Sequence, residues 1–556
     1  MMTRVVGKLW LSSRPAFFLF SLPFDLPFKN SQPVYLKMSN DNDENWKDKE
    51  PVAGLSAASS CIRLSICLDD DGKPPPSRQF SPVYTHQCFP DEFISGWRPM
   101  SSAEQLSQQV YQRWRYGSVG EASASTIGEK HSSYRKIDGE ENQIDANVLL
   151  SPACDTCKID VTTSTSSPVS NINTDEPATK KAKIVTFEEA DDGSTQQLSI
   201  DDVIKKIQSS LPPIASVTIN GSSTATKGAK SGATEFKYLS HPVGVVVKSY
   251  RRNIKNDNDT VEKGDFVITL AKGSDPSVAS YHNAIQPLAR WFIETADDVN
   301  ISDEDGGFWT VLYLFRKHED KSSDDGTSTF RYSLAGYITL FHFYAPFRKP
   351  KSGIIVRVCQ ALILPTYQRA GHGSDLLLSV HEYADRYLND YASTSTGMDI
   401  VEVNVEDPAP GFVALRDSVD YKRFVLLLES MRDTIDKLPD LKYLQKYPVT
   451  SKEYFQPAPD GGLSLASLLK ITKRQTEVMH EIYKLTAVEK WKHGSKDNAQ
   501  IQQVETNYRL MIKKSLKSHR TEELGACEGG KEEQKALLAK WFDQTHSHYR
   551  KLLGLV

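Results

Sequence analysis

The chain has few cysteines for its length and no long apolar run. Seven cysteines are scattered through 556 residues. They form no disulfide framework, so we expect a reducing compartment. Cys154 and Cys157 have a zinc-like spacing, but no second pair accompanies them, so we expect no metal. No apolar run approaches the roughly 20 residues that a membrane-spanning helix needs, so no membrane span is expected.

An excess of positive charge is also missing. The chain carries 67 basic and 71 acidic residues, a formal charge of −4, which gives no reason to expect direct binding to nucleic acid. Apolar residues make up 39% of the chain and the mean hydropathy is −0.45. Both values are low for one compact globule, so we expect disordered segments.

Two segments fit that expectation. Residues 1–55 form an N-terminal extension in which prolines interrupt a weak likeness to a signal or transit peptide. Residues 117–198 are rich in Ser, Thr, Asp, Glu, Asn and Lys, which predicts a disordered insertion. A basic cluster at 177–183 is either a nuclear-localisation signal or an ordinary solvated run.

One stretch combines a strand, a glycine-bearing turn and a helix. Residues 356–364 are apolar and β-branched, Pro365 breaks the pattern, and 374–388 have helical periodicity. Between them stands Gln368-x-x-Gly371-x-Gly373. Glycines let the backbone approach a ligand closely, and a helix N-terminus presents free N–H groups to an anion. The pattern indicates a phosphate- or pyrophosphate-binding turn, or else an ordinary tight turn.

The neighbouring segments predict a sheet around this turn. Residues 308–315 and 334–344 read as two antiparallel strands, and 279–295 have helical spacing. Residues 399–405 alternate like a strand that ends at Glu406-Asp407-Pro408. An acidic turn would explain the two carboxylates equally well. Beyond Gly411 the apolar spacing becomes helical, which predicts a separate helical region.

These motifs together resemble a known enzyme family. The segment 368–373 resembles the Q/R-x-x-G-x-G/A loop of the GCN5-related N-acetyltransferase superfamily. More specific likenesses to the type B histone acetyltransferase catalytic subunit run in order from about residue 61 to about 520. They lie at 82–87, 291–296, 336–339, 362–364, 405–408 and 415–417.

The resemblance implies an α/β (α+β) fold and a division into parts. The expected fold has an N-acetyltransferase mixed sheet with helices, an N-terminal α/β domain and a helical C-terminal region. The N-terminal, substrate-binding domain would occupy 56–116 and 199–275, the acetyl-CoA-binding domain 276–418 and the helical domain 419–556. The extension, the insertion and a lengthened loop at 389–398 depart from the family pattern.

The resemblance also implies an activity and partners. The enzyme would transfer acetyl from acetyl-CoA to lysines in the N-terminal tail of newly synthesised histone H4. Expected partners are histone H4 with H3 and a WD40-repeat histone chaperone, and the expected location is the nucleus and cytoplasm. The alternatives are an acetyl-CoA-dependent transferase with another amine substrate, and an inactive acetyl-CoA-binding subunit of a histone chaperone.

Site residues follow from the same resemblance. Glu406 is the expected general base, with Glu294 and Asp407 as supporting carboxylates or alternative bases. Substrate peptide would contact Asp91 and Glu92 and a strand at Phe341, His342 and Phe343. Cofactor contacts are expected at Ala361, Leu362, Ile363, Gln368, Arg369, Ala370, Gly371, His372, Gly373 and Ser374. Because acetyl transfer by direct attack needs no covalent enzyme intermediate, Cys359 is expected to be a core residue.

Overall fold

A computed structural model describes the chain in sixteen segments. They are 62–66, 79–80, 97–99, 134–136, 142–165, 200–219, 222–224, 237–255, 261–293, 296–320, 329–348, 351–387, 398–430, 465–494, 497–527 and 530–555. The site predictions at Asp91, Glu92 and Glu294, and the segment 82–87, therefore lie outside the described residues. No helix among the described segments is long and apolar enough to cross a membrane.

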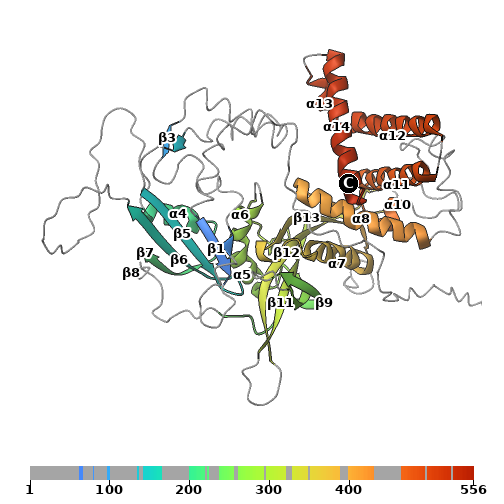
Figure 1. Cartoon of the computed structure of the whole chain (residues 1–556). Coiled ribbons are helices and arrows are strands. Elements are labelled where there is room, and N and C mark those ends of the chain that lie inside the picture. The colour runs from blue at the N-terminus through green and yellow to red at the C-terminus, as the bar shows by residue number, and fades with distance from the viewer. Residues whose placement is uncertain are drawn as a thin grey trace, which may run out of the picture. The chain divides into compact units, whose positions relative to one another are not determined.

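The first sheet has six strands in the order β2-β1-β5-β6-β7-β8 (Figure 1). The pairs β1·β5 and β6·β7 are parallel and the other pairs are antiparallel. The strands are β1 (Ile62–Ile66), β2 (Gln79–Phe80), β5 (Asn142–Leu150), β6 (Cys157–Thr165), β7 (Ile214–Ile219) and β8 (Ser222–Thr224), with helix α4 (Ile200–Gln208) between β6 and β7. A separate pair joins β3 (Trp97–Pro99) to β4 (Tyr134–Lys136).

This sheet corrects the predicted insertion at 117–198. Residues 142–165 form the hairpin β5–β6, and Val148, Leu150, Ile159 and Val161 are at most 1% exposed. The apolar residues alternate with Asn, Asp, Lys and Thr, so the average composition hides a strand whose one face is buried. Ser/Thr-rich composition therefore does not mark this part of the chain as an insertion.

The second sheet has six strands in the order β14-β13-β12-β11-β10-β9 (Figure 1). All its neighbouring pairs are antiparallel except β13·β14, which is parallel. The strands are β9 (Val245–Lys255), β10 (Val261–Lys272), β11 (Gly307–Asp320), β12 (Thr329–Ala345), β13 (Gly353–Ile363) and β14 (Ile400–Val405). The expected α/β class, the mixed sheet and the antiparallel β11–β12 pair are confirmed. Since β9 and β10 belong to this sheet, it begins about 30 residues before the expected boundary at 276.

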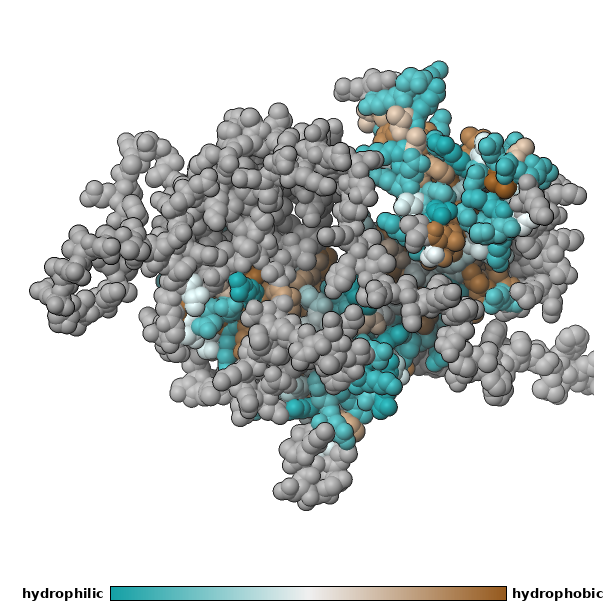
Figure 2. Space-filling view, in the orientation of Figure 1, coloured by the Kyte–Doolittle hydropathy of each residue, from teal (hydrophilic) through white to brown (hydrophobic). Residues whose placement is uncertain are grey.

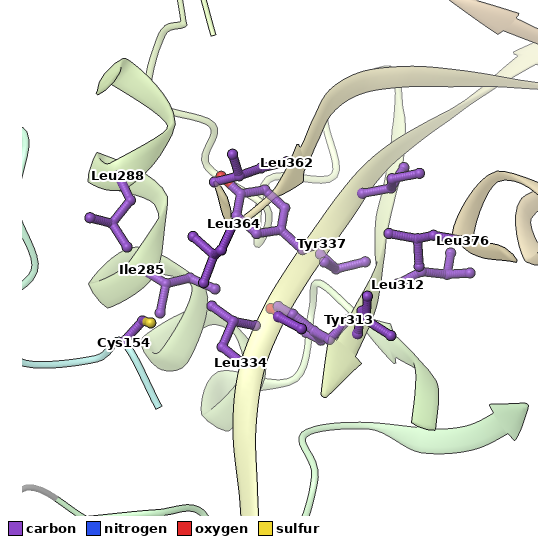
Figure 3. Close-up of a cluster of buried hydrophobic side chains, with 14 of the residues drawn as sticks. Cys154, Ile285, Leu288, Leu312, Tyr313, Leu334, Tyr337, Leu362, Leu364 and Leu376 are labelled. Carbon is purple, nitrogen blue, oxygen red and sulfur yellow. The ribbon is translucent and has the colours of Figure 1, made fainter. Parts of the chain in front are cut away.

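Helices flank the second sheet on both faces. Between β10 and β11 come α5 (Pro276–Ile285), the 3-10 turn η2 (Gln286–Leu288) and α6 (Ala289–Phe292). Ile285 and Leu288 pack with Leu362 and Leu364 of the sheet edge and with Tyr337 of β12 (Figure 3). On the other face, α7 (His372–Arg386) contributes Leu376, which lies by Leu312 of β11 (Figure 3).

Several hydrogen bonds connect the first sheet's loops to the second sheet and its helices. The Leu334 N–H donates to Pro152 O at 2.9 Å, the Tyr281 hydroxyl donates to Ala153 O at 2.8 Å, and the Trp291 indole donates to Ser210 O. Cys154 and Cys157 are buried beside these contacts. Burial raises the pKa of the Cys157 thiol to about 12 and that of Cys154 further, so both thiols stay protonated.

The C-terminal part is helical and has its own core. After α8 (Pro410–Ser430) come α10 (Leu465–Leu469), α11 (Lys473–Gly494), α12 (Asn498–His519), α13 (Thr521–Gly525) and α14 (Gly530–Leu552). Met479, Ile482, Ile512 and Trp541 are buried in this core. Hydrophilic residues, with hydrophobic ones between them, cover the visible face of these helices (Figure 2). The helical pattern predicted beyond Gly411 is confirmed, and α8 begins at Pro410, nine residues before the expected domain boundary at 419.

Candidate functional site

The site begins where β13 and β14 diverge. Their parallel pairing ends at Val358 and Val405, and the Glu406 N–H donates to Val358 O at 3.0 Å. β13 continues to Ile363 alongside β12 alone. In the described part of the chain, the last residues of β13 therefore have a ladder partner on one side only, and the other side is an open edge.

A β-bulge at Cys359 turns the backbone of this edge. Thr339 pairs with Gln360 and Leu340 with Val358, so Cys359 is the extra residue. The Val358 carbonyl faces β14, whereas the Gln360 N–H points to β12 and donates to Thr339 Oγ1 at 3.0 Å. Because successive backbone groups alternate in direction, Ala361 and Ile363 present their N–H and C=O groups to the open edge. An extended ligand laid there can form sheet-like hydrogen bonds.

The glycine-bearing turn closes one end of this edge. Gln368 Nε2 donates to Ile363 O at 2.8 Å, which connects the turn to the strand. Arg369 has φ +63° and Gly371 has φ +89°, so the backbone passes twice through the left-handed region. α7 then begins at His372, and no side chain caps its N-terminus. This end of α7 can accept an anion through free backbone N–H groups and its dipole.

Basic side chains from the edge strand β9 stand beside the turn. A Cβ atom at residue 371 would lie 3.4 Å from Arg252 Cζ. Arg252 is ion-paired with Asp375 in the first turn of α7, with Nη2 and Oδ2 2.5 Å apart. Lys248 Nζ lies 4.0 Å from the same carboxylate. The turn therefore combines a helix N-terminus with two cations, an environment suited to a phosphate.

Two predicted contact residues turn out to be buried. His372 is 1% exposed, its Nδ1 lies 2.8 Å from the Tyr250 hydroxyl, and burial lowers its pKa to about 4. Its side chain is therefore packed against β9 at the start of α7. Leu362 is 3% exposed and its carbonyl points toward β12 at Gly336. Of these two residues, only His372 has a backbone N–H group that a ligand can reach, because the N–H and C=O groups of Leu362 both point to β12.

Glu406 lies at the other end of the site, where β14 ends. Its side chain is 50% exposed, and its Oε1 lies 3.5 Å from Arg357 Nη1. The Cys359 thiol is next to this carboxylate, and burial together with Glu406 raises the thiol pKa to about 12. Asp407 follows in the left-handed region with φ +32° and is exposed. The structure thus brings Glu406 and Asp407 to the open edge of β13.

An aromatic surface adjoins Glu406. Phe341 and Phe343 of β12 lie with their ring centroids 6.2 Å apart, and Trp309 of β11 lies 4.8 Å from Phe341. The Arg357 guanidinium lies 5.1 Å from the centroid of Phe343. Phe341, Phe343 and Arg357 are partly exposed, so this face can contact an apolar stretch of a ligand.

His342 does not belong to that surface. Successive residues of a strand face opposite sides, and His342 points under α7, where it is fully buried. Its Nε2 lies 3.0 Å from the Tyr383 hydroxyl, and burial lowers its pKa to about 3. The expectation that His342 lines a peptide is therefore corrected, because its side chain is part of the core beneath α7.

Sequence reasoning missed Arg357 and Trp309. A charged residue inside the apolar run 354–363 was a usable signal for Arg357, since an arginine there must reach solvent or a carboxylate. No local pattern indicated Trp309, because its place beside Phe341 follows only from the register of β11 against β12. The described residues contain no group of three or more His, Cys, Asp or Glu side chains placed to hold a metal ion.

Parts of this chain are similar in sequence to known proteins. Residues 158–294 match the family described as the N-terminus of the histone acetyl transferase HAT1. Proteins named histone acetyltransferase type B catalytic subunit are similar as well. One of those from Dictyostelium discoideum is 29% identical over 33% of this chain and 35% of its own length. The protein from Mus musculus is 27% identical over 57% of this chain and 61% of its own length. The human protein of this name is 28% identical over 46% and 49%.

Over part of its length, the chain is therefore similar to the type B histone acetyltransferase catalytic subunits. The aligned segments cover between 35% and 61% of these three relatives. The family match runs from β6 through α6, so it includes the second strand of the hairpin β5–β6, which composition alone had assigned to an insertion. The open edge of β13 lies outside that match.

Proposed function

We propose that this chain is a histone acetyltransferase of the type B kind. It transfers acetyl from acetyl-CoA to lysine ε-amino groups in the N-terminal tail of newly synthesised histone H4. The observation that carries the proposal is the open edge of β13, with an anion-binding helix start at one end and Glu406 at the other. Histone H3 with H4, a WD40-repeat histone chaperone and a nuclear and cytoplasmic location belong to the same proposal.

The acetyl donor fits this edge by its chemistry. Acetyl-CoA combines a pyrophosphate, an extended pantetheine arm with two amides, and a thioester. The turn at 368–374 offers N–H groups to the pyrophosphate, and the outward backbone of Ala361 and Ile363 offers hydrogen bonds to the amides. The thioester end then lies toward Cys359 and Glu406.

Proton removal is the main chemical demand on the protein. A lysine side chain has an ordinary pKa near 10.4, so its deprotonation at pH 7 costs about 4.6 kcal/mol. Glu406 takes this proton directly or through one water molecule. The amine nitrogen attacks the thioester carbon and the C–S bond breaks. The leaving thiolate of coenzyme A takes up the second proton that the nitrogen loses, which gives the amide and free coenzyme A. An outward N–H group of β13 stabilises the developing oxyanion.

The aromatic surface supports a peptide substrate. Phe341, Phe343 and Trp309 provide partly exposed rings beside Glu406, and such rings contact the aliphatic part of a peptide side chain. Asp407 adds a second carboxylate that favours a cationic segment. Asp91, Glu92 and Glu294 remain predicted contributors through the family resemblance.

Transfer from radiolabelled acetyl-CoA tests the proposal. The full-length chain should label a peptide of the H4 tail and should not label the same peptide with each lysine replaced by arginine. Labelling of a small polyamine but not of the H4 peptide would favour a transferase with another amine substrate. If calorimetry shows acetyl-CoA binding while no amine is labelled, the chain is instead a silent acetyl-CoA-binding subunit.

A further inference from the structure

A short segment of the C-terminal region extends the second sheet. Residues 469–472 connect α10 to α11 and run along the outer edge of β14. The Val403 N–H donates to Lys470 O at 2.7 Å, and Val403 and Ile471 form a parallel bridge. Lys470 adopts φ +53°, which is strained for a residue with a side chain. The strand that ends at Glu406 is therefore held from both sides.

The side chain of Lys470 joins that strand to the helix of the glycine-bearing turn. Its Nζ donates to Ala384 O of α7 at 2.8 Å and to Asp399 Oδ1 at 3.1 Å. Asp399 directly precedes β14. The Lys470 side chain is only 14% exposed, and hydrogen bonds from a buried cation are stronger than surface ones. One residue thus contacts both elements that frame the open edge.

A second cation holds the same segment from α8. Arg423 Nη1 donates to Leu469 O at 3.0 Å and lies 2.9 Å from His381 Nδ1 on α7. Its Nη2 donates to Asp385 Oδ2 at 3.2 Å. The Arg423 side chain is 12% exposed. The segment 469–472 therefore lies within a network of hydrogen bonds to α7, α8 and β14.

The packing beneath β14 is incomplete at this place. A cavity of about 160 Å³ is lined by residues 403–405 of β14, by Ile471 and Thr472 of the segment itself, and by residues of α7, α8 and α11. The Asn404 Oδ1 atom has no hydrogen-bond partner in the described part of the chain. Close packing normally fixes a strand, and a cavity removes part of that constraint. The position of β14 therefore depends more strongly on the bonds to Lys470.

We propose that residues 469–472 position β14 relative to α7 and thereby set the distance from Glu406 to the open edge of β13. Lys470 is the principal positioning residue. The expected effect on catalysis rests on the proposed function, whereas the positioning of β14 does not. It assigns the C-terminal helical region a role in the chemistry, although none of the residues described in that region belongs to the site as defined above.

Replacing Lys470 by methionine tests the inference in the full-length protein. Met keeps the length and apolar stem of Lys and removes the two hydrogen bonds of Nζ. We expect kcat for the H4 peptide to fall about tenfold, because small displacements of catalytic groups are costly. The KM for acetyl-CoA should stay within twofold, and Lys470→Arg should recover part of kcat. Lys490→Met, an exposed change on α11, is the matched control.

Hydrogen exchange gives a readout that needs no activity. In Lys470→Met, amides of 400–406 should exchange at least tenfold faster than in the wild type or in Lys490→Met. If Lys470→Met does not fold, Lys470→Gln provides the same comparison. Unchanged kcat, or unchanged exchange in β14, overturns the inference. A wild-type protein that labels no amine refutes the proposed function, while faster exchange would still show that Lys470 holds β14.

Discussion

At Gly371, two substitutions should separate the effect of backbone strain on stability from the effect of negative charge on acetyl-CoA binding. It has φ +89° and ψ −1° and directly precedes α7. A side chain there meets no hard obstacle, because the nearest atoms belong to Arg252 and begin at 3.4 Å. Gly371→Ala therefore introduces only the left-handed strain, whereas Gly371→Glu adds a negative charge beside the proposed pyrophosphate position.

The two effects differ in size and in what they change. The left-handed conformation costs a residue with a Cβ about 1–2 kcal/mol, which lowers stability in both variants. A carboxylate about 5 Å from one phosphate charge adds roughly 3 kcal/mol of repulsion at an effective dielectric constant near 20. Because every 1.4 kcal/mol is tenfold, Gly371→Glu should weaken acetyl-CoA binding by about 100-fold.

Calorimetric titration with acetyl-CoA measures this difference, and thermal unfolding reports on stability. Gly371→Ala should lose stability with an affinity within about fivefold of the wild type. Gly494→Glu places the same charge at an open glycine at the end of α11 and should leave both quantities unchanged. If Gly371→Glu binds acetyl-CoA as tightly as Gly371→Ala, the turn is not the pyrophosphate site.

Three further predictions concern neighbouring residues. Cys359→Ser should keep kcat within about threefold, because a thiol with a pKa of about 12 stays protonated, and a trapped acetyl-enzyme by mass spectrometry would contradict this. Phe341→Ala should raise the KM for the H4 peptide about tenfold with acetyl-CoA affinity unchanged, and an unchanged peptide KM would remove the aromatic surface from the substrate site. His342 has its folded pKa lowered from 6.5 to about 3, so its stabilising effect is complete above pH 6.5 and is lost as pH falls toward 3. Urea unfolding measures the free energy of unfolding as a function of pH. Between pH 6 and pH 4.5, His342→Gln should reduce the slope of this free energy against pH by up to about 1.4 kcal/mol per pH unit. An unchanged slope would refute the assignment of His342 as a neutral buried residue.

Local sequence signals predicted the helices and strands whose ends are marked by proline, by glycine or by a change in the apolar pattern. The break at Pro365, the glycines at 371 and 373 and the alternation before Glu406 each mark a boundary, and the corresponding elements are β13, α7 and β14. The first sheet was harder to predict. The strand β6 buries Cys157, Ile159 and Val161 while its other residues are Asp, Lys, Ser and Thr, so composition over a long window concealed it.

The geometry of the site depends on register and long-range contacts that no local pattern encodes. The bulge at Cys359 decides which carbonyls face the open edge, and it is visible only when β12 and β13 are aligned. The same alignment separates His342, which is buried, from the partly exposed Phe341. Lys470 lies 64 residues beyond Glu406 in the chain and reaches β14 through tertiary folding alone.

The central claim is that Glu406 removes the proton from the attacking lysine at the open edge of β13. Its most direct test is the kcat for the H4 peptide in Glu406→Gln, measured beside Glu429→Gln, the same change on the exposed surface of α8. General base catalysis contributes about 10²–10⁴-fold, so Glu406→Gln should lose at least 100-fold in kcat and bind acetyl-CoA like the wild type. Glu429→Gln should match the wild type in both. A Glu406→Gln protein that keeps kcat within threefold would contradict the assignment of Glu406 as the base.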